Sequence, residues 1–280
     1  MASERFVSAA GVRARVIEEG SGTPVLLVHG VAAWAENWAL TMPALARAGF
    51  RAVACDLPGF GQTPAPANAR YFDPPQPYYT RFIRELTDAL GLGPMHLVGH
   101  SLGGAIASVA AALMPERFRS LTLVSPGGYG VRLALSFRLS SLRIATLVAR
   151  LAPTAFVRDS VAACFCDPSC APEWVFADAE RYARAGGAVE FTRVLRQGVT
   201  LRGPRRHLRD AWDPVVRRIA LPTLVVWGKQ DAVLPVADLP EVTARLPHAE
   251  VKLIDRAGHL VQLERPVEFN DALVAFLQRA

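Results

Sequence analysis

Short apolar segments alternate with amphipathic segments along most of the chain, and this alternation predicts its architecture. The apolar runs at 24–30, 120–128, 222–228 and 249–255 have the length and composition of buried β-strands. Helical stretches such as PYYTRFIRELTDALGLG lie between the runs. Near the N-terminus, RFVSA and VRARVIEE are separated by Gly11 and predict an antiparallel hairpin. The pattern therefore predicts an α/β protein, with a largely parallel sheet covered by helices on both faces.

The alternation stops between about Gly127 and Asp213, where the chain is arginine-rich and mainly helical in pattern. It resumes at the strand 222–228, so we expect a discontinuous core, 1–126 and 214–280, interrupted by an inserted lobe, 127–213. Within this lobe, 132–151 is predicted to form one helix whose apolar stripe includes Phe137 and faces the core. Ordinary packing of the lobe and direct contact with a substrate both explain this stripe.

Composition narrows the class of protein. The chain has 280 residues and 51% hydrophobic residues, enough for one large core. Its net charge of +6 comes almost wholly from arginine, and the cluster LRGPRRHLRD forms either a solvated basic face or an anion-binding patch. Since no nucleic-acid-binding motif accompanies it, we expect no nucleic-acid partner.

Two further features bear on location. The most apolar stretch, 131–153, is interrupted by Arg138 and Arg143, which argues against a transmembrane segment. The N-terminal sequence MASERFVSAAG lacks the pattern of a secretion signal, so the expected location is cytoplasmic.

Four cysteines raise the question of a metal site. Cys164, Cys166 and Cys170 are closely spaced, but no fourth Cys or His follows at the spacing of a zinc site. We therefore expect reduced thiols and no metal. A disulfide within this trio is the alternative.

The segment GHSLGG at 99–104 joins the apolar run PMHLV to the alanine-rich helical stretch AIASVAAAL. A strand that turns into a helix within two residues forces the central residue toward positive φ and leaves no room for side chains two positions away. Gly99 and Gly103 meet this demand, so Ser101 is presented at the carboxyl end of the sheet, next to free N–H groups of the helix. This arrangement predicts a nucleophilic serine.

A serine nucleophile needs a base and an orienting carboxylate, which should lie in loops after later strands. Asp231 in WGKQDAVLP and His259 in IDRAGHLVQLE fit, giving the chain order Ser, Asp, His. Asp255 is the alternative acid, whereas Asp56 is expected to organise its own loop. We expect His100 to pack beside the site, and His96, His207 and His248 to be structural or surface residues.

An anionic tetrahedral intermediate requires two converging donors. One is expected from the backbone N–H of Leu102, and the other from Val31 in the loop HGVAAW, which His29 and Gly30 would shape. HG as an ordinary strand end is the alternative interpretation.

Taken together, HG at 29–30, DLPGFGQT at 56–63, GHSLGG, GKQD at 228–231 and GH at 258–259 resemble the α/β-hydrolase fold superfamily along essentially the whole core. The resemblance implies an eight-stranded, mostly parallel, doubly wound sheet with a helical cap inserted after the sixth strand. It also implies that Ser101, Asp231 and His259 form a catalytic triad, with Val31 and Leu102 as the oxyanion hole.

The resemblance also bears on activity. The tail GHLVQLERPVEFNDALVAFL is similar to that of hydrolases of meta-cleavage products, which often carry NSMGG at the elbow and tryptophan after the histidine; here His100 and Leu260 stand instead. We therefore expect a carboxylesterase of small or medium apolar acyl groups that uses no cofactor, with Trp34, Phe137 and Leu260 as pocket residues. The alternatives are carbon–carbon hydrolysis and a small-ligand receptor on the same scaffold. The oligomeric state stays open.

Overall fold

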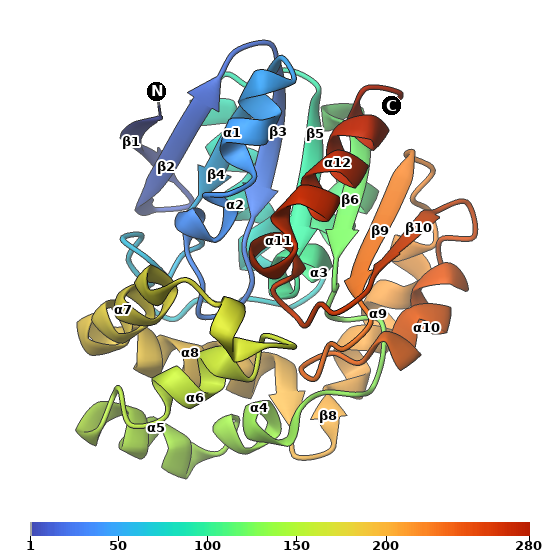
Figure 1. Ribbon diagram of the computed structural model, residues 1–280. Helices are drawn as coiled ribbons and strands as arrows, with labels where there is room; N and C mark the ends of the chain where they lie inside the picture. The colour runs from blue at the N-terminus through green and yellow to red at the C-terminus, as the bar shows by residue number, and fades with distance from the viewer. Residues whose placement is uncertain (1) are drawn as a thin grey trace.

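A computed structural model describes residues 2–280 and contains one eight-stranded sheet (Figure 1). The order across the sheet is β1-β2-β4-β3-β5-β6-β9-β10, with β1, β2 and β4 joined antiparallel and all other neighbours parallel. Its strands are β1 Ser3–Ala9, β2 Val12–Gly20, β3 Thr23–Val28, β4 Phe50–Cys55, β5 Met95–His100, β6 Phe118–Val124, β9 Thr223–Gly228 and β10 Glu250–Ile254. The predicted parallel sheet with its antiparallel opening hairpin is confirmed.

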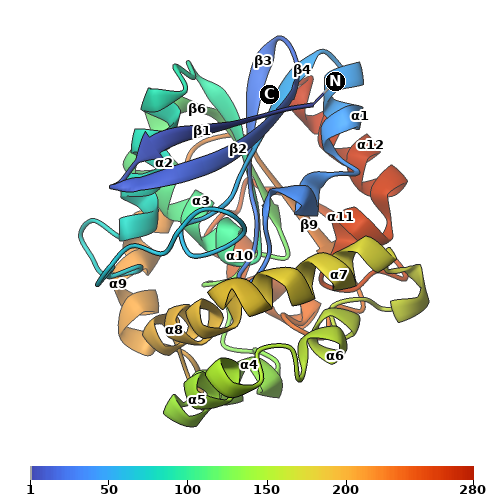
Figure 2. The same ribbon diagram turned by 90° about the vertical axis from the view of Figure 1, so that its left-hand side faces the viewer.

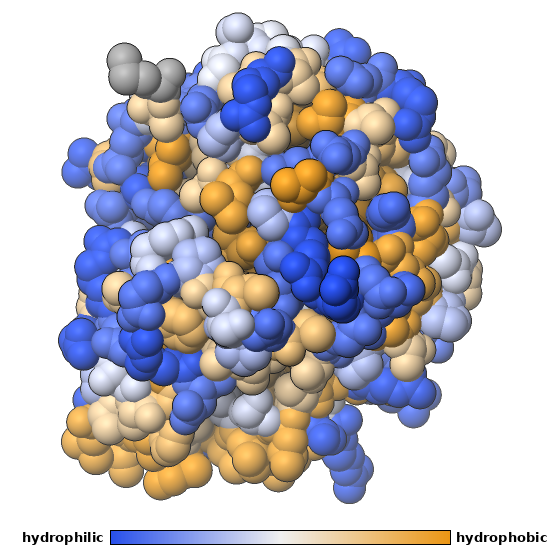
Figure 3. All heavy atoms as spheres, in the orientation of Figure 1, coloured by the Kyte–Doolittle hydropathy of each residue, from blue (hydrophilic) through white to orange (hydrophobic). Residues whose placement is uncertain are grey.

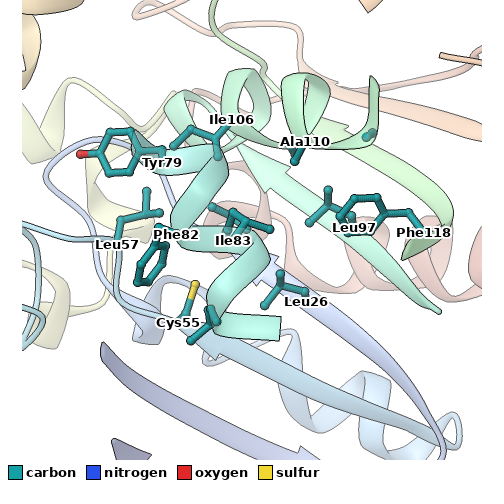
Figure 4. Close-up of a cluster of buried hydrophobic side chains, with 14 of the residues drawn as sticks. Leu26, Cys55, Leu57, Tyr79, Phe82, Ile83, Leu97, Ile106, Ala110 and Phe118 are labelled. Carbon is teal, nitrogen blue, oxygen red and sulfur yellow. The ribbon is translucent and has the colours of Figure 1, made fainter. Parts of the chain in front are cut away.

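Both faces of the sheet are covered, as the continuous apolar runs predicted. In β3, Leu26 and Val28 pack into one buried cluster, while Val25 and Leu27 pack into the cluster on the opposite face. The first face is covered by α2 Tyr78–Ala89 and α3 Leu102–Leu113, and the second by α1 Met42–Arg47 and α12 Pro266–Leu277. Figure 4 shows Phe82 and Ile83 of α2 among the side chains of the first cluster.

The segment between β6 and β9 is mainly helical and lies over the carboxyl ends of the parallel strands (Figures 1 and 2). We call residues 127–213 the cap. The segment contains α4 Leu135–Ser140, α5 Arg143–Leu151, α6 Val157–Ala162, α7 Glu173–Tyr182, α8 Ala188–Gly198, the short strands β7 Val199–Thr200 and β8 Gly203–Pro204, and α9 Arg206–Val216. The predicted boundary at 213 falls inside α9, so the division into core and cap stays a prediction. Two short helices complete the fold: α10 Leu239–Thr243 and α11 Val261–Glu264.

The prediction of a single helix over 132–151 is wrong, because the chain breaks between α4 and α5. Ser140 Oγ donates to the Ser136 carbonyl at 2.8 Å, and Ser141 Oγ donates to the Arg138 carbonyl at 2.7 Å. Leu142 then adopts an extended conformation with ψ 151°. Serine hydroxyls that bond nearby carbonyls compete with the helical backbone ladder, and two consecutive serines end the helix here.

Within residues 2–280, no helix is both long and apolar enough to cross a bilayer.

Candidate active site

The turn from β5 into α3 has the strained geometry that its glycines predicted. Ser101 has φ 53° and ψ −116°, and its backbone N–H donates to the Val124 carbonyl at 2.9 Å. A Cβ added at Gly99 would lie 2.3 Å from the Gly103 carbonyl oxygen, and one added at Gly103 would lie 2.3 Å from the Val28 carbonyl oxygen. A larger side chain at Gly99 would collide with α3, and one at Gly103 would collide with the end of β3, so the turn depends on both glycines.

A buried carboxylate orients the imidazole of His259. Asp231 Oδ2 accepts a hydrogen bond from His259 Nδ1 at 2.8 Å, and both side chains are almost completely buried. Asp231 Oδ1 accepts from the backbone N–H groups of Val233 and Leu234, at 2.9 and 2.8 Å. Trp227 Nε1 donates to Oδ2 at 3.2 Å. The bond to Asp231 places a proton of His259 on Nδ1, which leaves Nε2 directed away from the carboxylate to accept another.

Ser101 and His259 both line one cavity of about 970 Å³ beneath the cap. The structure also places the three predicted pocket residues, Trp34, Phe137 and Leu260, in the wall of this cavity. Trp34 packs against Tyr182 of α7 with ring centroids 5.0 Å apart. Among the described residues the wall contains no arginine or lysine, so the cavity is suited to apolar and uncharged groups.

The loop after β3 approaches Ser101 closely. A Cβ at Gly30 would lie 3.0 Å from the Cβ of Ser101. Within residues 2–280, neither the Val31 N–H nor the Leu102 N–H donates a hydrogen bond to the protein, and both residues line a cavity that Ser101 also lines. These two N–H groups are therefore available to an oxygen bound at Ser101.

The side chain of His29 is neutral and holds the loop after β3 in place. Its Nε2 accepts from the Leu57 N–H at 2.8 Å, so Nδ1 carries the proton and donates to the Gly30 carbonyl at 2.6 Å. Burial lowers the pKa of His29 to about 4. His29 thus links the loops that follow β3 and β4.

His100 contacts the histidine of the site through the backbone. Its Nε2 donates to the His259 carbonyl at 2.9 Å, and its Nδ1 lies 3.5 Å from Asn37 Nδ2. Burial, and next the neighbouring His259, hold the pKa of His100 well below its ordinary value. A neutral His100 therefore positions the His259 loop, as the predicted packing role requires.

Sequence reasoning missed the anchoring of this loop by Glu264. The buried carboxylate accepts from the N–H groups of Gly258 at 2.6 Å, Cys166 at 3.1 Å and Asp167 at 2.8 Å. The Cys164 carbonyl accepts from the His259 N–H at 2.7 Å. A cap segment and the histidine loop are therefore joined directly. No local pattern marks such a bond, since Glu264 lies far in sequence from the cap residues.

The structure keeps the alternative acid away from His259. Asp255 is exposed and bonds Lys229 and Gln230, so it cannot orient a buried imidazole. Asp56 organises its loop as expected: it accepts from the N–H groups of Ala35 and Gln62, both at 2.7 Å. The remaining histidines lie elsewhere: His96 bonds Ser120 Oγ inside the sheet, His248 bonds the Leu221 carbonyl, and His207 is exposed on α9.

A second, smaller cavity of about 200 Å³ shares Val31, Ser101 and Phe137 with the first. Its wall is mainly apolar but includes Arg205, which precedes α9, and Arg209 within α9. Asp213 and Arg245 also line it and form an ion pair with each other. Arg205 bonds the Arg196 carbonyl, whereas the buried Nε of Arg209 has no hydrogen-bond partner in the described part of the chain. The two cavities therefore offer different environments on either side of Ser101.

The three closely spaced cysteines form no disulfide with one another. The thiols of Cys164, Cys166 and Cys170 are free, and residues 2–280 contain no group of three His, Cys, Asp or Glu side chains placed to hold a metal ion.

Comparison with known proteins finds relatives that are similar to this chain over most of its length. The chain is 30% identical over 287 residues to the 2-hydroxy-6-oxo-6-(2'-aminophenyl)hexa-2,4-dienoic acid hydrolase of Metapseudomonas resinovorans, covering 99% of this chain and 91% of that protein. It is 31% identical to the dihydrolipoyllysine-residue acetyltransferase component of the acetoin cleaving system of Pseudomonas putida, over 92% of this chain but only 64% of that protein.

A solved structure and a family model agree with these matches. The structure of a meta-cleavage product hydrolase from Pseudomonas fluorescens superposes with a TM-score of 0.80 at 25% identity, covering 98% of this chain and 97% of the other. The model of the alpha/beta hydrolase fold matches residues 23–266. With the sheet order and the serine elbow described above, these matches show that the chain belongs to the α/β hydrolase fold family.

Proposed function

We propose that this hydrolase is a serine hydrolase that cleaves esters of small or medium apolar acyl groups through Ser101, His259 and Asp231. The observation that carries the proposal is the 2.8 Å bond between Asp231 and His259 on the wall of the cavity that Ser101 also lines. A serine hydroxyl is a weak nucleophile, and an oriented neutral imidazole is the group that activates it.

In the proposed reaction, Ser101 Oγ attacks the ester carbonyl and its proton passes to His259 Nε2. The Asp231 carboxylate stabilises the imidazolium, and the Val31 and Leu102 N–H groups stabilise the oxyanion. The intermediate collapses with transfer of the proton from Nε2 to the departing alcohol, leaving an acyl group on Ser101. Water then attacks the acyl carbonyl while His259 Nε2 accepts a proton from the water. The second intermediate collapses as Nε2 returns this proton to the departing Ser101 Oγ, which releases the acid and restores the enzyme.

The chemistry of the larger cavity supports an apolar acyl group. Its wall is rich in alanine, valine, leucine and aromatic side chains and lacks a cation among the described residues. A charged acyl group would lose its hydration there without gaining a partner. The cavity volume of about 970 Å³ accommodates medium-length chains.

A second candidate, carbon–carbon hydrolysis, is favoured by a separate observation. The relative from Metapseudomonas resinovorans is named for a dienoic acid substrate, and the smaller cavity beside Ser101 carries Arg205 and Arg209, which suit a carboxylate. The same three residues would act on a ketone carbonyl in this reaction.

Parallel kinetics separate the candidates. The wild type and Ser101→Ala are assayed with p-nitrophenyl esters from acetate to laurate and with a 6-oxo-dienoic acid. Turnover of the esters that depends on Ser101, with an optimum chain length, supports the proposal. Faster turnover of the acid, together with a rise in KM for the acid but not for esters in Arg209→Gln, favours carbon–carbon hydrolysis. Tight binding without turnover of either substrate contradicts both and indicates a receptor.

A further inference from the structure

Helix α5 presents its large apolar side chains to solvent. Ile144, Leu147, Val148 and Leu151 recur at helical spacing on one side of α5, and they are between 39% and 77% exposed. A surface helix of a globular protein ordinarily turns such a stripe inward. Helix α5 therefore turns its apolar side outward, opposite to that expectation.

The inward side of α5 shows why the helix cannot simply be turned over. Ala149 is buried there, and Thr146 Oγ1 lies 2.9 Å from Thr192 Oγ1 of α8. Small side chains let α5 pack closely on α8, and rotation would force leucine and isoleucine side chains into that narrow contact. The exposed stripe is thus a fixed feature of the cap.

Neighbouring segments extend this stripe into a surface patch. Of the fourteen exposed large hydrophobic residues in the described chain, eight lie within 131–156. We call these eight the cap patch: Val131, Leu135, Leu139, Ile144, Leu147, Val148, Leu151 and Phe156. Figure 3 shows hydrophobic side chains gathered along the edge of the molecule that α4 and α5 form in Figure 1. Clustering of this kind marks an interaction surface.

Arginines predominate among the charged residues beside the cap patch, although the exposed Asp159 closely follows it in the sequence. The segment 131–158 contains five arginines and no aspartate, glutamate or lysine. Arg132 and Arg158 form ion pairs with residues outside the segment. Arg143 and Arg150 are exposed next to the apolar stripe, and within residues 2–280 neither has an acidic partner. The surface therefore combines exposed apolar side chains with uncompensated cations.

We propose that the cap patch docks this protein on an anionic phospholipid surface. Helices that lie in a membrane interface have this composition, with apolar side chains entering the acyl boundary and arginines contacting phosphate groups. A second copy of the chain is disfavoured as the occupant, because a symmetric contact through this face would bring arginines against arginines.

Docking would place the cavity close to the lipid. Ala145 and Ala149, on the opposite side of α5 from Leu147 and Leu151, line the cavity that holds Ser101. Four members of the cap patch are both exposed and part of the cavity wall, so the patch borders the cavity: Leu139, Ile144, Val148 and Phe156. Helix α5 would then lie between the bilayer and the cavity. The inference goes beyond the proposed function, because binding to lipid is measured without any turnover.

The test is flotation of the full chain with vesicles of phosphatidylcholine alone and of phosphatidylcholine with phosphatidylglycerol at a ratio of about three to one. We expect binding to the anionic vesicles that weakens in high salt, and much weaker binding to the neutral ones. Failure to bind anionic vesicles at low salt would overturn the proposal.

Two double variants and two control variants, measured in the same flotation assay, test whether the cap patch is the surface that binds the vesicles. Leu147→Ser with Leu151→Ser is expected to weaken binding at least about tenfold, and Arg143→Gln with Arg150→Gln about 25-fold, at roughly fivefold per arginine. The controls Val267→Ser and Arg119→Gln change exposed residues of the core and should leave binding unchanged.

None of these residues lines the larger cavity, so turnover of a water-soluble ester reports that each variant is folded. Sedimentation analysis tests the alternative that a second copy of the chain, and not lipid, covers the cap patch. A dimer that the leucine variant dissociates, without vesicle binding by the wild type, would assign the cap patch to self-association and contradict the proposal.

Discussion

Helices α2 and α5 are both amphipathic, but they direct their apolar sides oppositely. In α2, Phe82, Ile83 and Leu86 are fully buried against the sheet (Figure 4). In α5, Leu147 and Leu151 are exposed while Ala149 is buried. The difference shows that amphipathic periodicity predicts a helix with two unlike sides, whereas the surface against which it folds decides which side is covered. The sheet offers α2 a wide apolar face, and α8 offers α5 only a close, partly polar contact.

The largest expected effect is a loss of kcat, and it follows from a substitution in the core, which carries the proposed catalytic residues. Asp231→Asn should lower kcat for p-nitrophenyl acetate about 10⁴-fold, because an amide no longer fixes the proton of His259 on Nδ1. Asp255→Asn is the matched control, since it removes the same charge from an exposed site and should leave kcat unchanged. Equal losses in the two variants would contradict the assignment of Asp231.

The comparison of α2 with α5 predicts unequal costs of truncation. Phe82→Ala should lower the free energy of unfolding by about 3–5 kcal/mol, because it leaves a cavity in the core. Leu147→Ala on α5 should change it by less than about 0.5 kcal/mol, since the side chain is half-exposed. Urea unfolding measures both, and a comparable loss in the two variants would show that the α5 stripe is covered in solution.

Core and cap are also joined, and Glu264→Gln tests that junction. The amide keeps one acceptor but sets an N–H₂ group against backbone N–H donors, so we expect a loss of about 2 kcal/mol in stability. A fall of about tenfold in kcat should accompany it, because the His259 loop loses its anchor. Glu268→Gln changes an exposed glutamate of α12 and serves as the control. An unchanged kcat in Glu264→Gln would limit its role to stability.

The smallest effect concerns His29 and pH. Burial lowers the pKa of His29 to about 4 from an ordinary 6.5, so between these values the unfolded chain binds a proton that the folded chain excludes. The contribution of His29 to the free energy of unfolding is fully present above pH 6.5. It falls by about 1.4 kcal/mol per pH unit as the pH drops toward 4. In urea unfolding at pH 7, 6 and 5, the free energy of unfolding of His29→Gln should fall less steeply with decreasing pH than that of the wild type. Equal slopes in the two proteins would mean that His29 is protonated in the folded state.

The features predicted from sequence are those with local causes. The strands follow from short apolar runs, and the positive φ of Ser101 follows from the glycines two positions away on either side. Asp231 and His259 were located because each directly follows a strand of a parallel sheet, whose carboxyl ends share one edge.

The features that escaped prediction depend on contacts between distant segments or on weak local competition with the backbone. The carboxylate of Glu264 accepts from backbone N–H groups of the cap about a hundred residues away, and no periodicity in the sequence relates these partners. The break between α4 and α5 rests on the hydroxyls of Ser140 and Ser141, which compete with the backbone only weakly, so apolar spacing alone suggested one helix. The apolar stripe of α5 faces outward because α5 packs closely on α8 through its small side chains, a contact that the sequence pattern does not reveal.

The central claim is that Ser101 carries the acyl group during turnover. Rapid-quench mass spectrometry of the protein mixed with p-nitrophenyl acetate tests it most directly, with proteolysis to locate the modification. We predict one added acetyl group on the peptide that contains Ser101, formed within a single turnover and absent in Ser101→Ala. Steady release of p-nitrophenol with no acetyl group on that peptide, or equal turnover by Ser101→Ala, would contradict the account.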